Sequence, residues 1–150
     1  MRFLLVDQIL EWSPEGKIRG VKNVAMSEDY LEFHFQGNPV MPGALLLEAM
    51  GQLAGWREGA ASDFQQWFLL DTVRRCAYYG FALPGDRVEL ELEPLPDPTP
   101  GRRAWRGTGL VDGKKRVTAE FEGAVVPLAE LEDPESQRHL FGRLTRERKF

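Results

Sequence analysis

Two side chains that could move protons, His34 and Glu48, lie fourteen positions apart around the start of the most apolar segment of the chain. That segment, residues 40–56, reads VMPGALLLEAMGQLAGW, and Glu48 is its one charged residue. An imidazole, which titrates close to neutrality, can remove a proton next to a carbonyl group. A carboxyl group in apolar surroundings can supply a proton, because burial favours the protonated form. Together the two groups could act as the general base and the general acid of one reaction.

The same segment predicts the element that positions these groups. A helix that is apolar on nearly every side belongs inside the fold. Pro42 suits the first helical turn, where its missing N–H has no partner to lose, and Gly43 allows another group to approach the backbone closely. We therefore expect the helix to begin near Pro42 and to end near Gly59. Free N–H groups at its start could stabilise negative charge on an oxygen, and Gly43 is the best placed.

Strand-like sequence surrounds this helix on both sides. Residues 2–12 and 20–26 are rich in Leu, Val and Ile and read as a hairpin, and residues 27–38 alternate apolar and polar side chains up to the helix start. Four further strands are predicted after the helix: residues 67–77, 87–93, 104–111 and 115–126. Asp112 and Gly113 form a strong turn signal between the last two. We therefore predict an α+β fold, in which an antiparallel sheet of about five or six strands wraps round one long central helix.

Length and composition fit one ordinary domain. The chain has 150 residues, of which 43% are hydrophobic, and its net charge of −4 argues against a general nucleic-acid-binding role. Glu48 interrupts the apolar segment and no signal peptide precedes it, so we expect a cytoplasmic protein without a membrane span. The single cysteine, Cys76, excludes an internal disulfide and a multi-cysteine metal site.

The polar end of the chain is expected to stand apart from this domain. We predict a domain over residues 1–127 and a charged tail over residues 128–150, acidic first and basic later. Because the tail lacks apolar periodicity, we expect a short surface helix or a mobile segment. Truncation after Pro127 is therefore expected to leave the assembly and its chemistry largely intact.

A longer motif connects His34 to Glu48. Residues 34–52 read HFQGNPVMPGALLLEAMGQ and closely resemble the signature of the FabZ-type 3-hydroxyacyl-acyl-carrier-protein dehydratases, a family with the hot-dog fold. Shorter stretches in the same order extend the resemblance over roughly residues 2–127: FLLVD at 3–7, VKNV at 21–24, PGD at 84–86 and LVDG at 110–113. The sequence departs from the family pattern at Phe33, Gln36 and Tyr79, and it lacks the usual N-terminal helix.

The resemblance implies a reaction and the residues that carry it. The reaction is the reversible dehydration of a (3R)-3-hydroxyacyl thioester to the trans-2-enoyl thioester in fatty-acid synthesis, with His34 and Glu48 as the catalytic pair. Gly43 would bind the thioester oxygen through its N–H group. Three further residues are expected to support the site: Gln52, Pro42 and Met41. Neither a metal nor an organic cofactor is expected.

The resemblance also implies the partners. We expect acyl carrier protein with its acyl-phosphopantetheine as substrate, and a homodimer or a trimer of dimers as the assembly. In the family the glutamate that faces each histidine comes from the other protomer. The carrier is acidic, so an acidic enzyme needs a local basic patch, for which five arginines are candidates: Arg74, Arg75, Arg102, Arg103 and Arg106.

Two other functions are compatible with these residues. The first is a hot-dog thioesterase, or a dehydratase that acts on coenzyme A thioesters, and either would use the same helix start. The product distinguishes a thioesterase from a dehydratase, because a thioesterase releases a free acid whereas a dehydratase forms an enoyl thioester. The second is a non-catalytic acyl-binding subunit. Retention of both His34 and Glu48 argues against it, because an acyl pocket without chemistry has no use for an isolated carboxylate.

Overall fold

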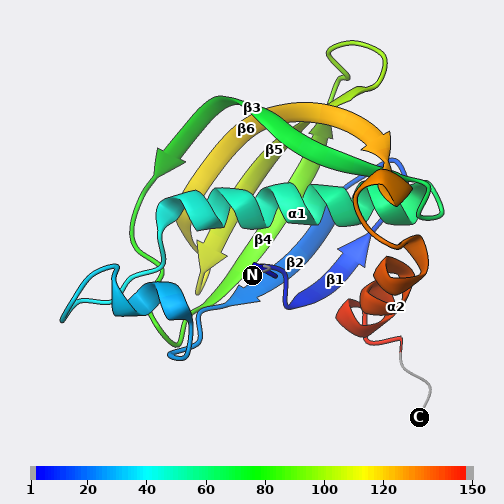
Figure 1. The fold of residues 1–150 in the computed structure, drawn as a ribbon. Helices are drawn as coiled ribbons and strands as arrows, with labels where there is room; N and C mark the ends of the chain where they lie inside the picture. Colours follow the sequence, from blue (N-terminus) through cyan, green and yellow to red (C-terminus); the bar gives the residue numbers. More distant parts are fainter. Residues whose placement is uncertain (1–2, 148–150) are drawn as a thin grey trace.

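Helix α1 (Gly43–Ala61) lies along the inner face of a curved antiparallel sheet in the computed structural model, which describes residues 3–147 (Figure 1). Six strands form the sheet: β1 (Gln8–Trp12), β2 (Ile18–Asn23), β3 (Gln66–Tyr78), β4 (Arg87–Leu95), β5 (Arg102–Val111) and β6 (Lys114–Pro127). Their order is β1-β2-β4-β5-β6-β3, so β1 and β3 are the two edges. A sheet wrapped round one helix confirms the predicted α+β architecture and the hot-dog fold.

The alternation of side chains in β4 explains why the sheet closes over the helix. Val88, Leu90 and Leu92 are buried, while the glutamates between them lie on the opposite side of the sheet. Met50 and Leu53 of α1 are also fully buried in the same core. Because each large apolar side chain removed from water contributes about 1.5–3 kcal/mol, this contact between α1 and the sheet is a main source of stability.

The predicted turn at Asp112 and Gly113 joins β5 to β6. Both residues have positive φ angles, 50° and 75°, which suit a type I′ turn. Turns of this type match the twist of two antiparallel strands, and the observed strands begin and end close to the predicted ranges. Local turn chemistry therefore fixes the register at this end of the sheet.

The segment before α1 does not form the extended structure that its alternation indicates. Residues Asp29–Glu32 form the short 3-10 helix η1, and the chain then passes through turns to the start of α1. The backbone oxygen of Tyr30 accepts hydrogen bonds from the N–H groups of Phe33 and His34, which winds the segment. Leu31 is the buried residue of η1, and no strand of the described sheet pairs with this segment. Without a neighbouring strand, local hydrogen bonds determine its conformation.

The boundaries of two predicted elements are corrected. Strand β1 begins at Gln8, because the residues before it turn to α1, where Leu5 donates its N–H to Oε1 of Gln52 at 2.9 Å. Pro42 is the residue before the first helical turn, with extended φ and ψ angles of −56° and 131°, so the helix begins at Gly43. The helix ends at Ala61, two residues beyond the predicted end.

The polar tail contains a helix that packs against the domain. After the 3-10 turn η2 (Leu128–Glu130), helix α2 (Pro134–Leu144) lies beside the end of α1 (Figure 1). Asp133 caps α2 by accepting a hydrogen bond from the N–H of Ser136. Phe141 is buried, and its ring centroid lies 5.7 Å from that of Trp12 and 5.6 Å from that of Phe64. The tail was expected to form a short surface helix or a mobile segment; it forms a helix, and Phe141 and Leu144 of this helix are buried in the core. No helix of the described residues is long and apolar enough to cross a membrane.

Candidate active site

The start of α1 presents backbone N–H groups without partners. The carbonyl oxygen of Pro42 accepts a hydrogen bond from the N–H of Leu45 at 3.0 Å, which closes the first turn. No described residue accepts a hydrogen bond from the N–H groups of Gly43 and Ala44. These groups lie at the positive end of the helix dipole, where an oxygen that gains negative charge is stabilised. The position suits the oxyanion-binding role predicted for Gly43.

His34 is held in one orientation by the backbone that leads into α1. Its Nδ1 lies 3.0 Å from the carbonyl oxygen of Val40. A carbonyl oxygen can only accept, so this contact assigns the proton of the neutral ring to Nδ1 and leaves Nε2 free to take a proton. The ring of Phe35 stacks on the imidazole with centroids 4.0 Å apart, which limits its rotation. The arrangement suits the role of a general base that the sequence predicts for His34.

His34 and Gly43 line the same apolar pocket, which has a volume of about 600 Å³. Met41 also lines the pocket, and the N–H of Met41 donates to the carbonyl oxygen of Ala82 at 2.9 Å. This hydrogen bond joins the helix start to the segment that follows β3. The far wall includes Tyr78, Gly80, Phe81 and Ala82. A pocket of this size and character could take the acyl chain of a thioester.

Tyr78, at the end of β3, is a residue of this pocket that no sequence motif marks. A Cβ atom built on Gly43 would lie 2.6 Å from Cε1 of the Tyr78 ring, so a side chain at this position would require the ring to move. The ring of Tyr78 therefore packs against the bare backbone of Gly43. Burial, and secondly a hydrogen bond with Cys76, raises the pKa of Tyr78 to about 12. Its hydroxyl group therefore stays neutral at physiological pH.

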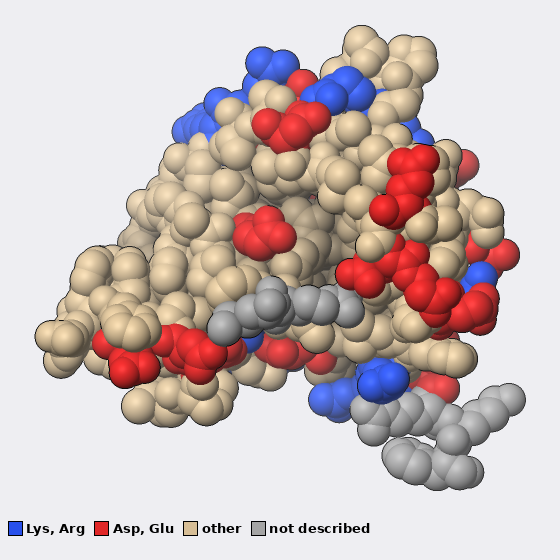
Figure 2. All heavy atoms as spheres, in the orientation of Figure 1, with Lys and Arg blue, Asp and Glu red and all other residues tan. Residues whose placement is uncertain are grey.

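Glu48 is exposed in a single chain, which corrects the expectation of a buried carboxylate. Its Oε1 accepts a hydrogen bond from Nε2 of Gln52 at 3.1 Å. The same Nε2 donates to the backbone oxygen of Phe3 at 2.8 Å. Figure 2, seen in the orientation of Figure 1, shows charged side chains mainly along the margins of this face and one isolated acidic group in its middle. A largely uncharged surface of this kind is typical of a protein contact.

One chain does not bring all the predicted site residues together. His34, Met41 and Gly43 line the pocket and Pro42 lies between the last two in the chain, whereas Glu48 and Gln52 do not line it. Glu48 follows Gly43 by five residues, which places it about 7 Å further along the helix axis. Among residues 3–147, no three His, Cys, Asp or Glu side chains are grouped in a way that could hold a metal ion.

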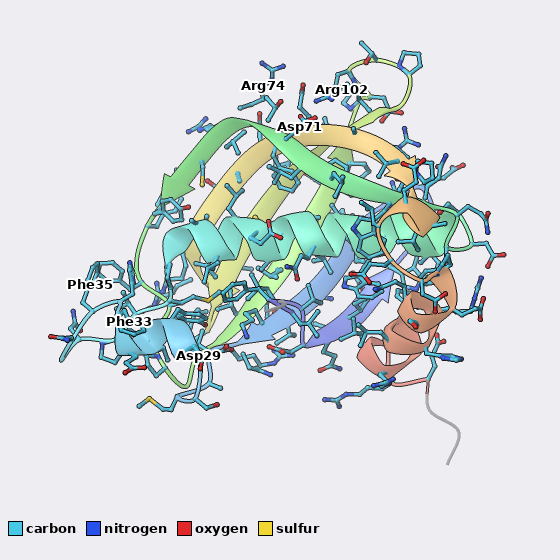
Figure 3. The ribbon with its side chains drawn as sticks, in the orientation of Figure 1. Asp29, Phe33, Phe35, Asp71, Arg74 and Arg102 are labelled. Atoms are coloured by element: carbon cyan, nitrogen blue, oxygen red, sulfur yellow. The ribbon has the colours of Figure 1, made fainter. Side chains whose placement is uncertain are left out.

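Four of the five arginines proposed for carrier docking are already bound by carboxylates. Figure 3 shows Arg74, Asp71 and Arg102 together at one side of the molecule. Arg102 makes hydrogen bonds of 2.7 and 2.9 Å to Asp71, which lower the pKa of Asp71 to about 2 and keep the pair ionised at neutral pH. Arg74 binds Glu122 at 3.0 Å. Two more arginines have carboxylate partners within 3.3 Å: Arg103 and Arg106. These four therefore offer little free positive charge.

Comparison with known proteins places the chain in a family. A family model described as a FabA-like domain matches residues 1–120. The curated 3-hydroxyacyl-acyl-carrier-protein dehydratase FabZ of Oleidesulfovibrio alaskensis is 36% identical over 129 residues, which cover 83% of this chain and 82% of the relative. The FabZ of Ruegeria is 32% identical over 128 residues, which cover 82% and 79%.

A solved structure gives independent support for the fold. A Streptococcus mutans protein bound to acetyl CoA superposes with a TM-score of 0.64 and covers 85% of this chain and 94% of its own. At 12% identity this likeness speaks for the fold alone. The family model and the curated relatives extend over most of the chain, well beyond the motif between His34 and Gln52. The chain therefore belongs to the FabA-like domain family, among the FabZ-type 3-hydroxyacyl-acyl-carrier-protein dehydratases.

Proposed function

We propose that this chain dehydrates (3R)-3-hydroxyacyl thioesters of acyl carrier protein to trans-2-enoyl thioesters in fatty-acid synthesis. The observation that carries the proposal is one apolar pocket, of about 600 Å³, lined by both the imidazole of His34 and the helix start at Gly43. A base and an oxyanion donor beside the same cavity are what proton removal next to a thioester carbonyl requires. The curated relatives bear the name of this activity.

The elimination uses three groups of the protein. Nε2 of His34 takes a proton from C2 of the substrate, and the electron pair moves toward the thioester carbonyl. The carbonyl oxygen gains negative charge and is held by the N–H of Gly43. As the double bond forms between C2 and C3, the hydroxyl group on C3 leaves with a proton from the carboxyl group of Glu48, as water. Proton exchange with solvent returns both side chains to their starting states.

Glu48 reaches the pocket from a second copy of the chain in this proposal. In one chain Glu48 is exposed and does not line the pocket of His34. Strand β3 is paired with β6 on one side, and within the described sheet its 13 residues have no neighbour on the other side. An edge of this length is a template for another strand, and Leu69 and Val73 on β3 are 41% and 43% exposed. A homodimer, alone or within a trimer of dimers, would cover this edge.

The product of the reaction tests the proposal. Purified protein is incubated with (3R)-3-hydroxyacyl thioesters of acyl carrier protein and of coenzyme A, and the products are separated by mass. We expect the enoyl thioester and its rehydration in the reverse direction. A free acid with a free thiol would identify a thioesterase, and an unchanged substrate would identify an acyl-binding protein. His34→Ala should lose at least ~10²-fold in rate, while His139→Ala on α2 serves as the matched control and should keep it.

A further inference from the structure

Strand β6 opens with three cations that have no carboxylate partner in the part of the chain that the structure describes. Lys114, Lys115 and Arg116 form no ion pair with any residue in the described range 3–147. By contrast, Arg102 and Arg106 on the outer face of the sheet are each bound by two carboxylates. On a chain with a net charge of −4, a local group of free positive charges can attract an anion that the rest of the surface repels.

Arg116 lies directly behind the wall of the pocket. A Cβ atom built on Gly80 would lie 3.3 Å from Cδ and 3.4 Å from Nη1 of Arg116, so the guanidinium stem covers the bare backbone of Gly80. Gly80 is itself one of the residues that line the pocket of His34 and Gly43. The N–H of Tyr79 donates to the carbonyl oxygen of Arg116 at 2.9 Å and fixes the two segments to each other. The charge is therefore held beside the pocket.

The guanidinium group also has an unused donor. Nε of Arg116 is buried from solvent and makes no hydrogen bond with a described residue. A buried donor without an acceptor is unfavourable, and an anion beside it would supply one. The planar guanidinium presents donors in a fork that fits two oxygens of a phosphate group.

We propose that Arg116, supported by Lys114 and Lys115, binds the phosphate group at the outer end of the pantetheine arm that carries the acyl chain. The inference rests on the proposed function, since the thioester end of the arm occupies the pocket and the phosphate stays outside. Acyl carrier protein and coenzyme A both carry a phosphate at this end of the arm. The site therefore recognises a chemical group that the two substrates share, and the free positive charge favours its approach.

A binding measurement tests the site without turnover. The affinities of 4′-phosphopantetheine and pantetheine are measured by calorimetry on the full-length protein and on Arg116→Gln. The control is Arg143→Gln on α2, which removes another arginine without an ion pair among the described residues. We expect the wild type and the control to prefer the phosphorylated ligand by about tenfold, and Arg116→Gln to lose this preference. Arg116→Lys should keep part of it, because the charge remains without the fork. An unchanged preference in Arg116→Gln, or none in the wild type, would overturn the proposal.

Turnover then distinguishes the sources of the phosphate. KM is measured for 3-hydroxyacyl thioesters of acyl carrier protein, coenzyme A and N-acetylcysteamine, of which the last has no phosphate. Arg116→Gln should raise KM about tenfold for the first two and leave the third unchanged. Equal losses on all three would indicate structural damage, and a loss with the carrier alone would indicate recognition of its protein surface; either result contradicts a phosphate site. If the wild type dehydrates none of them, the proposed function fails, and the binding measurement alone decides this inference.

Discussion

Gln52 donates a hydrogen bond from Nε2 to Oε1 of Glu48 across 3.1 Å. The other side of the same amide group accepts the N–H of Leu5 at 2.9 Å, so the contact is held between α1 and the N-terminal segment. Because both the oxygen and the nitrogen of the Gln52 amide group are hydrogen-bonded, the amide group restricts the orientation of the Glu48 carboxylate, which would otherwise rotate freely on the exposed helix surface. We propose that Gln52 thereby positions the proton donor of the reaction.

Two substitutions at Gln52 separate positioning from stability. Gln52→Ala should lower both the thermal midpoint and kcat, because the N–H of Leu5 loses its acceptor and Glu48 loses its donor. Gln52→Glu keeps an acceptor for Leu5 but places a second carboxylate beside Glu48. We expect Gln52→Glu to retain more of the thermal midpoint and yet to lose about tenfold or more in kcat. Wild-type kcat in both folded variants would show that the contact does not serve the reaction.

A methyl group at position 43 should disturb the pocket. In Gly43→Ala the new Cβ would lie 2.6 Å from the ring of Tyr78, which must move. We expect the hydration of crotonyl thioester to slow by at least tenfold, or ~1.4 kcal/mol in the barrier. Gly142→Ala on α2 is the control, since no atom lies within 4 Å of its Cβ position. Equal rates in the wild type and Gly43→Ala would show that the reaction tolerates a methyl group at position 43 and does not depend on the contact between Gly43 and Tyr78.

Tyr78 should make stability depend on pH in the alkaline range. The folded chain holds the proton of Tyr78 with a pKa of about 12, whereas an unfolded tyrosine titrates near pH 10. The folded state therefore gains stability that is fully present below about pH 10 and is lost as the pH rises toward about 12. In Tyr78→Phe the urea midpoint should fall less over this window than in the wild type. The same fall in both proteins would show that Tyr78 does not titrate as described.

The tail should contribute to stability, contrary to the expectation from its polar composition. Phe141→Ala removes a buried ring that contacts Trp12 and Phe64, at a cost of roughly 3 kcal/mol in the free energy of unfolding. Leu131→Ala, at a side chain that is 44% exposed, should cost less than about 0.5 kcal/mol. Truncation after Pro127 should be at least as damaging as Phe141→Ala. Chemical denaturation curves measure these differences. Equal midpoints for the wild type and the truncated chain would show that the tail does not contribute to the free energy of unfolding.

Features encoded by neighbouring residues could be predicted from the sequence, and features formed by distant contacts could not. The turn at Asp112 and Gly113 follows from local backbone preference, and the strands on both sides follow from alternation. The alternation before His34 predicts extended structure, but no strand of the described sheet lies beside this segment and it winds instead. The polar composition of α2 does not show its contribution to the core, because Phe141 meets Trp12, Trp56 and Phe64, which are distant in the sequence.

The candidate site could likewise be predicted from the sequence only where local signals define it. The types and spacing of His34 and Glu48 were sufficient to suggest the chemistry, and the helix start at Gly43 followed from local signals. Tyr78 could not be found in this way, because its contact with Gly43 joins the end of β3 to the start of α1. The exposure of Glu48 in one chain could not be predicted either, because it depends on how the folded elements pack and not on local sequence.

We propose that each site combines His34 of one chain with Glu48 of another. His34→Ala and Glu48→Gln are prepared as separate inactive homodimers, mixed in mild denaturant and returned to native conditions. In a mixed dimer one site has lost both groups and the other has kept both. Random exchange makes about half the dimers mixed, so roughly a quarter of the wild-type dehydration rate should return.

A matched mixture controls for the exchange itself. A tagged Glu48→Gln protein mixed with an untagged Glu48→Gln protein should remain inactive. In the mixture of His34→Ala and Glu48→Gln, different tags on the two chains allow mass spectrometry to measure the fraction of heterodimers. If the two chains share each site, about a quarter of the wild-type rate should return, in proportion to the heterodimer fraction. Full formation of heterodimers without any recovery would contradict it, because both groups of each site would then belong to the same chain.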